Sequence, residues 1–350
     1  MNSYYFYLII LSIGFTFSSC STELDINAEA EDIWVVWSIL NPSDSVQYVR
    51  ISKGFLPEED AFVYAKENDL SAKGLTLSLT DGINTYIGVE TDSILKNPAD
   101  GTFFPYLSLY RFDTKGTLAL KPNQAYTLNV SKPDDGDFFL RARTHIPDKV
   151  TFNNPRIVRG PNGHCLLPLA LDIGYEMKFQ RAEAAAAYEL RAFLNYTDKG
   201  QPRQATFGPS ALFEKNVRCL GGGGLNCYQF RPKELIEIFR AQMDPQANRF
   251  FEYTASENLR CAVTISELPD AFRFEVTTVD SVLYNYAQAN SPKFTDFNTL
   301  RIEYTNIESS ARALGILGAI AVSDISASFD PCTEYLLGLN SEQPRPSCTL

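Results

Sequence analysis

Histidine is scarce in this sequence, which has only two in 350 residues, His145 and His164. A zinc site built from three histidines is therefore impossible, and a hydrolytic triad has few options. The seven cysteines contain no C-x2-C pair, so the common cysteine spacing of a structural zinc site is missing as well. We therefore expect neither a metal ion nor a cofactor.

Positive charge is also in short supply, with 31 Lys and Arg against 42 Asp and Glu and a formal net charge of -11. Nucleic-acid binding depends largely on cationic side chains that neutralise phosphates. The composition therefore predicts no nucleic-acid partner. The acidic residues are spread along the chain, which is typical of a solvated surface, and an anionic membrane surface would repel such a body.

The motifs of nucleotide-binding enzymes are absent. The run Gly221–Gly224 lacks the Gly-Lys-Ser/Thr ending of a phosphate-binding loop, and no G-x-G-x-x-G follows a predicted strand. This run is interpreted as a flexible loop. Asp134, Asp135 and Asp137 surround Gly136, but the rest of a calcium-binding loop is missing, so a solvated turn is the expectation.

Only weak catalytic constellations remain. His164 adjoins Cys165, which could form a Cys–His nucleophile, but an exported chain favours a disulfide at that cysteine. We therefore predict a protein that is not an enzyme. A hydrolase that uses two carboxylates stays open as an alternative, because the separation of carboxylates in space is invisible in a sequence.

Long apolar runs occur only at the start. Tyr4–Phe17 is about fourteen residues, whereas a transmembrane helix needs about twenty. The length fits a signal peptide, and Ser18-Ser19 before Cys20 resembles a lipobox. We predict a signal peptide over residues 1–19 and acylation of the Cys20 thiol. The segment before Tyr4 has no Lys or Arg, so an ordinary secretory signal is the alternative.

Two or three acyl chains on Cys20 would anchor the protein stably, where one chain gives marginal binding. Residues 20–30 are predicted to form a lipidated acidic tether. Its start, Ser21–Asp25, weakly resembles the signal that sends Bacteroidetes lipoproteins to the outer face of the outer membrane. We expect a lipid-anchored protein of the outer membrane at the cell surface, with the periplasmic face as the alternative.

The six cysteines after Cys20 form an even set, which in an exported chain suggests disulfides, although six cysteines allow fifteen pairings. Two pairs are close in sequence, one across a glycine-rich loop and one across the C-terminal tail. The predicted pairs are Cys219 with Cys227, Cys332 with Cys348 and, by elimination, Cys165 with Cys261.

Alternation of apolar and polar residues predicts a mainly β protein with a few helices. The predicted strands lie at 33–40, 46–51, 75–79, 85–89, 117–120, 126–130, 138–144, 150–152, 188–196, 261–265 and 272–277, with a buried strand region at 313–322. Several short strands joined by turns suggest an immunoglobulin-like β-sandwich over residues 31–147. A larger β-rich domain with helical insertions is predicted over 148–335, followed by a tail, 336–350.

Two helices are expected in the second domain. Pro232 opens one that runs over Leu235–Met243 with its apolar residues on one face. The other runs from Asp280, which can cap it, to about Asn290.

Several stretches, in their order along the chain, resemble one family. They are Trp34-Val35-Val36 with Leu40-Asn41-Pro42, Tyr126–Val130, Ala142–Pro147, Ala187–Leu190 with Asn195-Tyr196-Thr197, and Thr305–Glu308 with Gly315–Gly318. The chain resembles, from about Leu24 to Ala327, the Bacteroidetes outer-membrane lipoproteins of domain-of-unknown-function family 4249. It departs from them in an insert before Gly315 and in its extra cysteines. The resemblance implies an outer-membrane lipoprotein that works beside a TonB-dependent transporter, and it transfers no active-site residue.

The leading hypothesis is thus a non-enzymatic surface lipoprotein that acts as a binding or accessory subunit, with a TonB-dependent transporter or another envelope protein as its partner. The alternative is a glycan-binding, adhesin-like lipoprotein.

Overall fold

The computed structural model describes residues 33–54, 61–95, 104, 106–116, 119–154, 158–159, 165–167, 175–208, 225–243, 272–290, 304–329 and 331–339. These residues form a mainly β protein with a few short helices, which confirms the predicted fold class. The helices are α2 (Ala61–Glu67), α3 (Pro232–Gln242), α4 (Ser281–Ala289) and α5 (Pro331–Leu337).

The strands form three sheets. A ten-stranded sheet has the order β14 (Gln201–Phe207), β13 (Ala187–Asp198), β16 (Phe272–Val279), β18 (Ala313–Phe329), β1 (Trp34–Leu40), β2 (Val46–Lys53), β6 (Tyr106–Asp113), β5 (Val89–Leu95), with β11 (Cys165–Leu167) beside β18 and β10 (Val158–Arg159) beside β11. A five-stranded sheet has the order β17 (Ile307–Ser309), β8 (Asp135–Ile146), β7 (Gln124–Lys132), β3 (Thr76–Thr80), β4 (Thr85–Ile87). A three-stranded sheet has the order β15 (Leu225–Phe230), β12 (Tyr175–Gln180), β9 (Phe152–Asn154).

Two hydrophobic cores lie on the same face of the ten-stranded sheet. The first takes buried side chains from this sheet and from the five-stranded sheet. The second takes them from the other end of the ten-stranded sheet, the three-stranded sheet, α3 and α5. Alternate residues of a strand point to the same face. In β18, Leu317, Ala319 and Ala321 belong to the first core, and Ile325 packs on the second.

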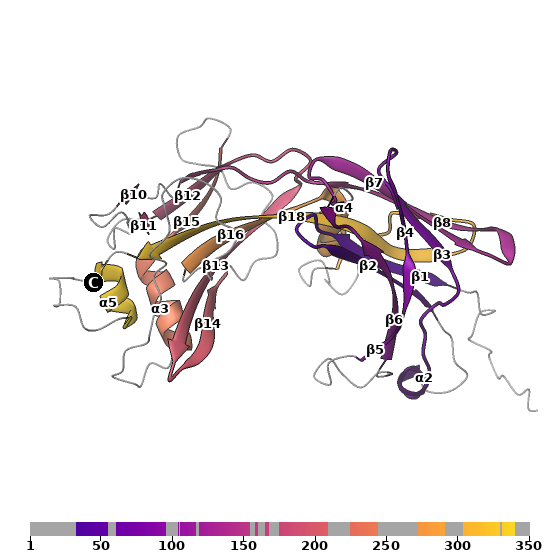
Figure 1. The fold of residues 1–350 in the computed structure, drawn as a ribbon, viewed down its shortest axis with the longest axis horizontal. Helices are drawn as coiled ribbons and strands as arrows, with labels where there is room; N and C mark the ends of the chain where they lie inside the picture. The colour runs from indigo at the N-terminus through magenta and orange to yellow at the C-terminus, as the bar shows by residue number, and fades with distance from the viewer. Residues whose placement is uncertain are drawn as a thin grey trace, which may run out of the picture.

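Strand β18 joins the two cores (Figure 1). Its first seven residues pair with β1 in parallel, and the next eight, Ile320–Ala327, pair with β16 in antiparallel orientation. The predicted domain boundary at residue 147 is therefore crossed by a strand, from the C-terminal part of the chain, that completes the N-terminal core. The predicted tail also begins inside a packed element, since Leu336, Leu337 and Leu339 are buried in the second core.

The elements expected from the pattern are largely present. The helices opened by Pro232 and capped by Asp280 are confirmed as α3 and α4. The strand region predicted at 313–322 is confirmed as the first part of β18. The predicted strand over 117–120 is wrong at its described residues: Ala119 and Leu120 form no strand, and the Ala119 amide donates to the Gly116 carbonyl in a turn. The strand predicted at 261–265 lies outside the described residues.

Gly315 is the point of closest approach between β18 and β1. Its φ is +101°, and a Cβ added there would lie 2.8 Å from the carbonyl carbon of Val36 and closer still to its oxygen. Val36 is the register partner of Gly315 in the parallel pair. Only glycine combines this φ with this backbone contact.

A Gly315→Ala change is expected to destabilise the protein by more than the left-handed backbone alone costs, because the methyl group meets main chain that cannot rotate away. Gly82→Ala is the matched control, since Gly82 has φ +91° but open space around its Cβ position. We expect about 1–2 kcal/mol for Gly82→Ala and an additional 1–3 kcal/mol, roughly, for Gly315→Ala. Equal losses of unfolding free energy in chemical denaturation would contradict this reading of the β1–β18 contact.

Candidate interaction surface

Among the residues that the structure describes, those of α4 cover the middle of the face of the ten-stranded sheet opposite the two cores. Leu283 of this helix packs with Ile316 of β18, and Ile39 of β1 lies against the same cluster. The contact is close at Gly318, where an added Cβ would lie 3.0 Å from the Cβ of Leu283. Beyond α4, toward β2, β6 and β5, the described part of this face is open and carries exposed side chains.

The open part carries an aromatic–arginine face, which we define as Trp37, Tyr48, Arg50, Val89 and Arg111. Strand pairing places them on one side of the sheet: Trp37 is the register partner of Arg50, Tyr48 of Arg111, and Arg111 of Val89. Trp37, Tyr48 and Val89 are 37%, 46% and 55% exposed, and both arginines are exposed. Large aromatic and aliphatic side chains thus alternate with guanidinium groups across four strands.

The charges on this face are poorly compensated. Arg111 contacts Asp113 at 3.3 Å, with both side chains largely exposed, and an exposed pair of this kind contributes little. Arg50 forms no ion pair with any described residue. At the other end of the same sheet face the arginines have close carboxylates on their own strands: Arg191 lies 2.9 Å from Glu189 and Arg273 lies 3.6 Å from Glu275.

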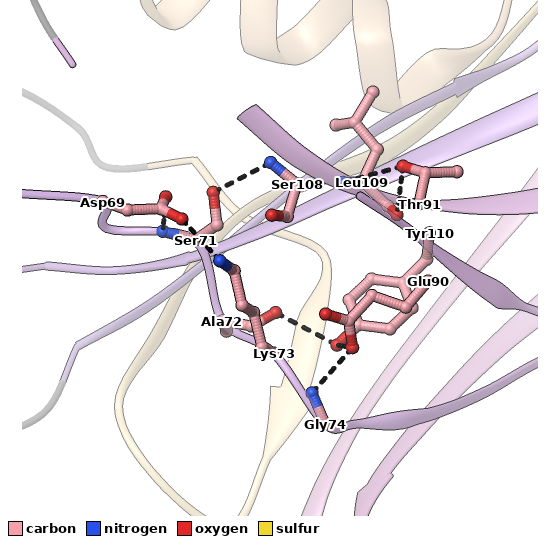
Figure 2. Close-up of polar contacts among 10 residues, drawn as sticks. All are labelled: Asp69, Ser71, Ala72, Lys73, Gly74, Glu90, Thr91, Ser108, Leu109 and Tyr110. Carbon is pink, nitrogen blue, oxygen red and sulfur yellow. Dashed lines mark hydrogen bonds and ion pairs between the residues drawn. The ribbon is translucent and has the colours of Figure 1, made fainter. Parts of the chain in front are cut away.

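A polar cluster on the core side of the sheet fixes the strands that carry this face (Figure 2). The Tyr110 hydroxyl accepts a hydrogen bond from the Leu75 amide at 3.0 Å and lies 3.0 Å from the Ala72 carbonyl oxygen, to which it donates. Burial raises the pKa of Tyr110 to about 12, so the hydroxyl keeps its proton at neutral pH. Because Tyr110 and Arg111 are consecutive, this anchoring sets the position of Arg111 on the opposite face.

The segment before β3 fills the space where β2 and β6 diverge. Ser71 accepts a hydrogen bond from the Ser108 amide at 3.2 Å, and its backbone bridges to Ser52 of β2 (Figure 2). Asp69 accepts from the Ser71 amide at 3.0 Å and pairs with Lys73 at 2.9 Å, which closes the turn. The cluster is structural, because its polar groups bond to one another and to the backbone.

Helix α4 borders the aromatic–arginine face on one side, where the ring of Tyr286 meets Trp37 edge-on with centroids 5.1 Å apart. The helix is held at its start by Asp280, which accepts from the Leu283 amide at 2.8 Å and from the Thr144 hydroxyl of β8. Asp280 and Thr144 are 2% and 3% exposed. A buried hydrogen bond therefore ties the border helix to the five-stranded sheet.

Hydrogen bonds from the Asn306 side chain fix β18 in the same region. The side-chain amide of Asn306 accepts from the Leu317 amide and donates to the Leu317 carbonyl, both at 3.0 Å, and it also donates to the Arg143 carbonyl of β8 at 3.0 Å. Asn306 thereby occupies the place of a neighbouring peptide on β18.

The predicted site residues are scattered. Cys20, Cys219, Cys261 and Cys348 lie outside the described residues, and so does His164; Cys165 lies in β11. Cys227 of β15 is buried, and Cys332 lies in α5. Both of these are in disulfide linkage, but the described residues do not define the sulfur to which each is bonded. The pairs named from the sequence remain predictions.

The remaining candidates form no catalytic constellation among the described residues. His145 is exposed, and its Nε2 lies 3.0 Å from the Asn123 side-chain oxygen. Asp134, Asp135 and Asp137 are exposed in the β7–β8 hairpin. In the described part of the chain no group of three or more His, Cys, Asp or Glu side chains is arranged to hold a metal ion, and no helix has the length and apolar character to cross a membrane.

One open pocket lies at the start of α3, lined by Glu176, Gln229, Phe230, Arg231 and Glu234. Glu176 accepts from the Gln229 side chain at 2.8 Å and pairs with Lys178 at 2.6 Å. These hydrogen bonds lower the pKa of Glu176, so it stays ionised and is unsuited to general-acid chemistry at neutral pH.

The aromatic–arginine face was not identified from the sequence, because an aromatic residue on a strand can lie on either side of the sheet. Tyr110, Tyr126 and Tyr188, for example, are fully buried. The signal that distinguishes Tyr48 is its parity: in Val46–Ile51 it alternates with Val49 and Ile51 and shares its side of the strand with Arg50.

Neither a family model nor a curated protein matches this chain.

Asp280 predicts a pH dependence of stability. Burial raises its pKa above the ordinary value, although the hydrogen bonds from Thr144 and Leu283 act in the opposite direction. A carboxyl whose pKa is raised on folding contributes stability at low pH that is lost as the pH rises through the folded-state pKa. Asp280→Asn keeps an acceptor for the Leu283 amide and carries no charge.

We expect the unfolding free energy of Asp280→Asn, relative to the natural protein, to increase as the pH is raised from about 4, near the ordinary carboxyl pKa, to about 8. Asp280→Ala is the control: it lacks the same carboxyl and is expected to follow the same pH trend, but it also loses the helix cap and should be less stable than Asp280→Asn by about 0.5–2 kcal/mol at every pH. Denaturation curves at several pH values measure both. A difference between the Asn variant and the natural protein that does not change with pH would show that Asp280 has no raised pKa.

Proposed function

We propose that this protein is a lipid-anchored lipoprotein of the outer membrane, not an enzyme, and that it acts as a binding or accessory subunit for an envelope protein such as a TonB-dependent transporter. The anchor is the acylated Cys20, and the partner-binding surface is the aromatic–arginine face. The immunoglobulin-like sandwich expected for the N-terminal part belongs to the same proposal.

The observation that carries the proposal is the composition of that face. Tryptophan, tyrosine and arginine are the residues enriched at energetically important positions of protein interfaces. Here Trp37, Tyr48 and two arginines share one exposed face of the sheet in a chain whose net charge is -11. Such positive groups on an acidic body fit a partner with an acidic surface that also offers apolar area. Electrostatic complementarity of this kind makes association dependent on salt.

The rigidity of the surface supports the same reading. The face rests on four hydrogen-bonded strands, with Tyr110 bonded to the backbone behind it and α4 fixed at its border. A preformed surface loses little conformational entropy on binding.

The test is a purification of the tagged full-length protein from native membranes in mild detergent, with co-purifying proteins quantified by mass spectrometry. The variant Tyr48→Ala with Arg111→Ala is expected to reduce recovery of the partner at least about tenfold, because truncation at an interface hot spot commonly costs about 2 kcal/mol. Tyr106→Ala is the matched control. Tyr106 is 45% exposed, close to the 46% of Tyr48, but it points to the other face of the sheet.

A partner that is retained by Tyr48→Ala/Arg111→Ala, or lost equally with Tyr106→Ala, would remove the aromatic–arginine face from the proposal. A protein that purifies alone, yet binds purified polysaccharide through Trp37 and Tyr48, would replace the protein partner with a glycan. Aromatic rings that stack on sugars would then account for the exposed side chains.

The anchor is tested separately. Cys20→Ala removes the acylation site and is expected to leave the protein soluble or unprocessed, whereas Cys20→Ser serves as a second variant that also lacks the thiol. Metabolic labelling of growing cells with a radioactive fatty acid measures acylation of the protein. Fractionation of the cell envelopes then measures its location. A Cys20→Ala protein that still fractionates with the outer membrane would contradict the anchor.

A further inference from the structure

The outer edge of the ten-stranded sheet at β14 is protected in an unusual way. Among the described strands β14 pairs only with β13, so one row of its backbone groups faces away from the sheet. Unpaired edges of this kind can add a strand from another chain. Which groups face outward, and what they meet, decides whether this edge is available.

The turn between β13 and β14 identifies the outward groups. Lys199 and Gly200 have φ of 52° and 74°, which makes a two-residue hairpin turn, and Asp198 pairs with Gln201 directly behind it. The pair that closes such a hairpin exchanges hydrogen bonds, and bonded and non-bonded pairs alternate from there. The outward backbone groups of β14 are therefore those of Pro202, Gln204 and Thr206.

Two of these three positions cannot form the full set of hydrogen bonds with an added strand. Pro202 has no N–H group and cannot donate to an added strand. At Thr206 the amide donates to the Gln242 side-chain oxygen at 2.9 Å, and the carbonyl accepts from the Gln242 side-chain nitrogen at 2.7 Å. The Gln242 amide thus makes both bonds that a neighbouring peptide would make. Only Gln204 keeps an outward N–H and C=O without a bond to a described residue.

Helix α3 places Gln242 at this edge. The helix buries Leu235, Ile236 and Phe239 in the second core, and the Phe239 ring packs edge-on against Phe272 at 6.1 Å. Gln242 is the last residue of the helix and is itself exposed. Its position is fixed by the buried face of α3, and its amide is available because the side chain lies outside the core.

We infer that Pro202 and Gln242 close the β14 edge to a second copy of this chain. The edge would otherwise pair with the same edge of another molecule, antiparallel and related by a two-fold axis, because identical edges form self-complementary interfaces. This inference is independent of the proposed partner. It leaves the face of the sheet, and not its β14 edge, for contacts with other proteins.

The test compares three forms of the full-length protein in detergent by multi-angle light scattering and by hydrogen exchange. Gln242→Ala is expected to form a dimer whose population rises with concentration, with faster exchange at the Thr206 amide in the monomer. Gln242→Ala with Gln204→Pro removes the N–H at the centre of the three outward positions, so that Thr206 alone of the three keeps an outward N–H, and it is expected to return the protein mass to that of one chain. Gln229→Ala, which deletes an exposed side-chain amide elsewhere, is the control and is expected to stay monomeric.

A Gln242→Ala protein that is folded by circular dichroism and remains monomeric at every concentration would overturn the inference. A dimer that persists in the Gln204→Pro double variant would overturn it as well, because the association would then use another surface.

Discussion

The parallel contact between β1 and β18 is the constraint on which the rest of the structure depends. β18 supplies side chains to the first core through its early residues and to the second through its later ones. The strand can lie against β1 only because Gly315 has no side chain where the Val36 backbone passes. The two cores therefore share one strand. The position of one core relative to the other is set by the hydrogen-bond register of β18, not by a linker.

Side-chain amides repeatedly complete the backbone bonding where a strand or turn has no neighbouring peptide. In each case one amide accepts from the N–H and donates to the C=O of the same residue, which satisfies both groups at an exposed or half-buried edge. A carboxylate in the same position could accept but not donate. The three pairs are Asn41 with Gln47, Leu317 with Asn306 and Thr206 with Gln242.

Much of the fold could be predicted from local sequence patterns, but less of the surface could. The alternation in Phe138–Ile146 and the Asp280 cap were readable because each depends on residues close in sequence. β6, β12, β14 and β15 were not predicted, and the pairing of β18 with β1 joins residues about 280 apart, which period and propensity do not encode. To predict the aromatic–arginine face, one would need both the side of the strand on which each residue lies and the register between strands. The alternation in β2 places Tyr48 on the exposed side, but only strand pairing places it beside Arg111.

The position of β1 has a mechanical consequence. Its N-terminal residue, Trp34, follows directly on the segment that leads back to Cys20, and β1 is held by β18 on one side and β2 on the other. A pull on that segment along the strand loads the bonds to both neighbours in shear, so they must break together and not one after another. Force transmitted through the N-terminus would thus reach both cores through β18 before β1 could be drawn out of the sheet.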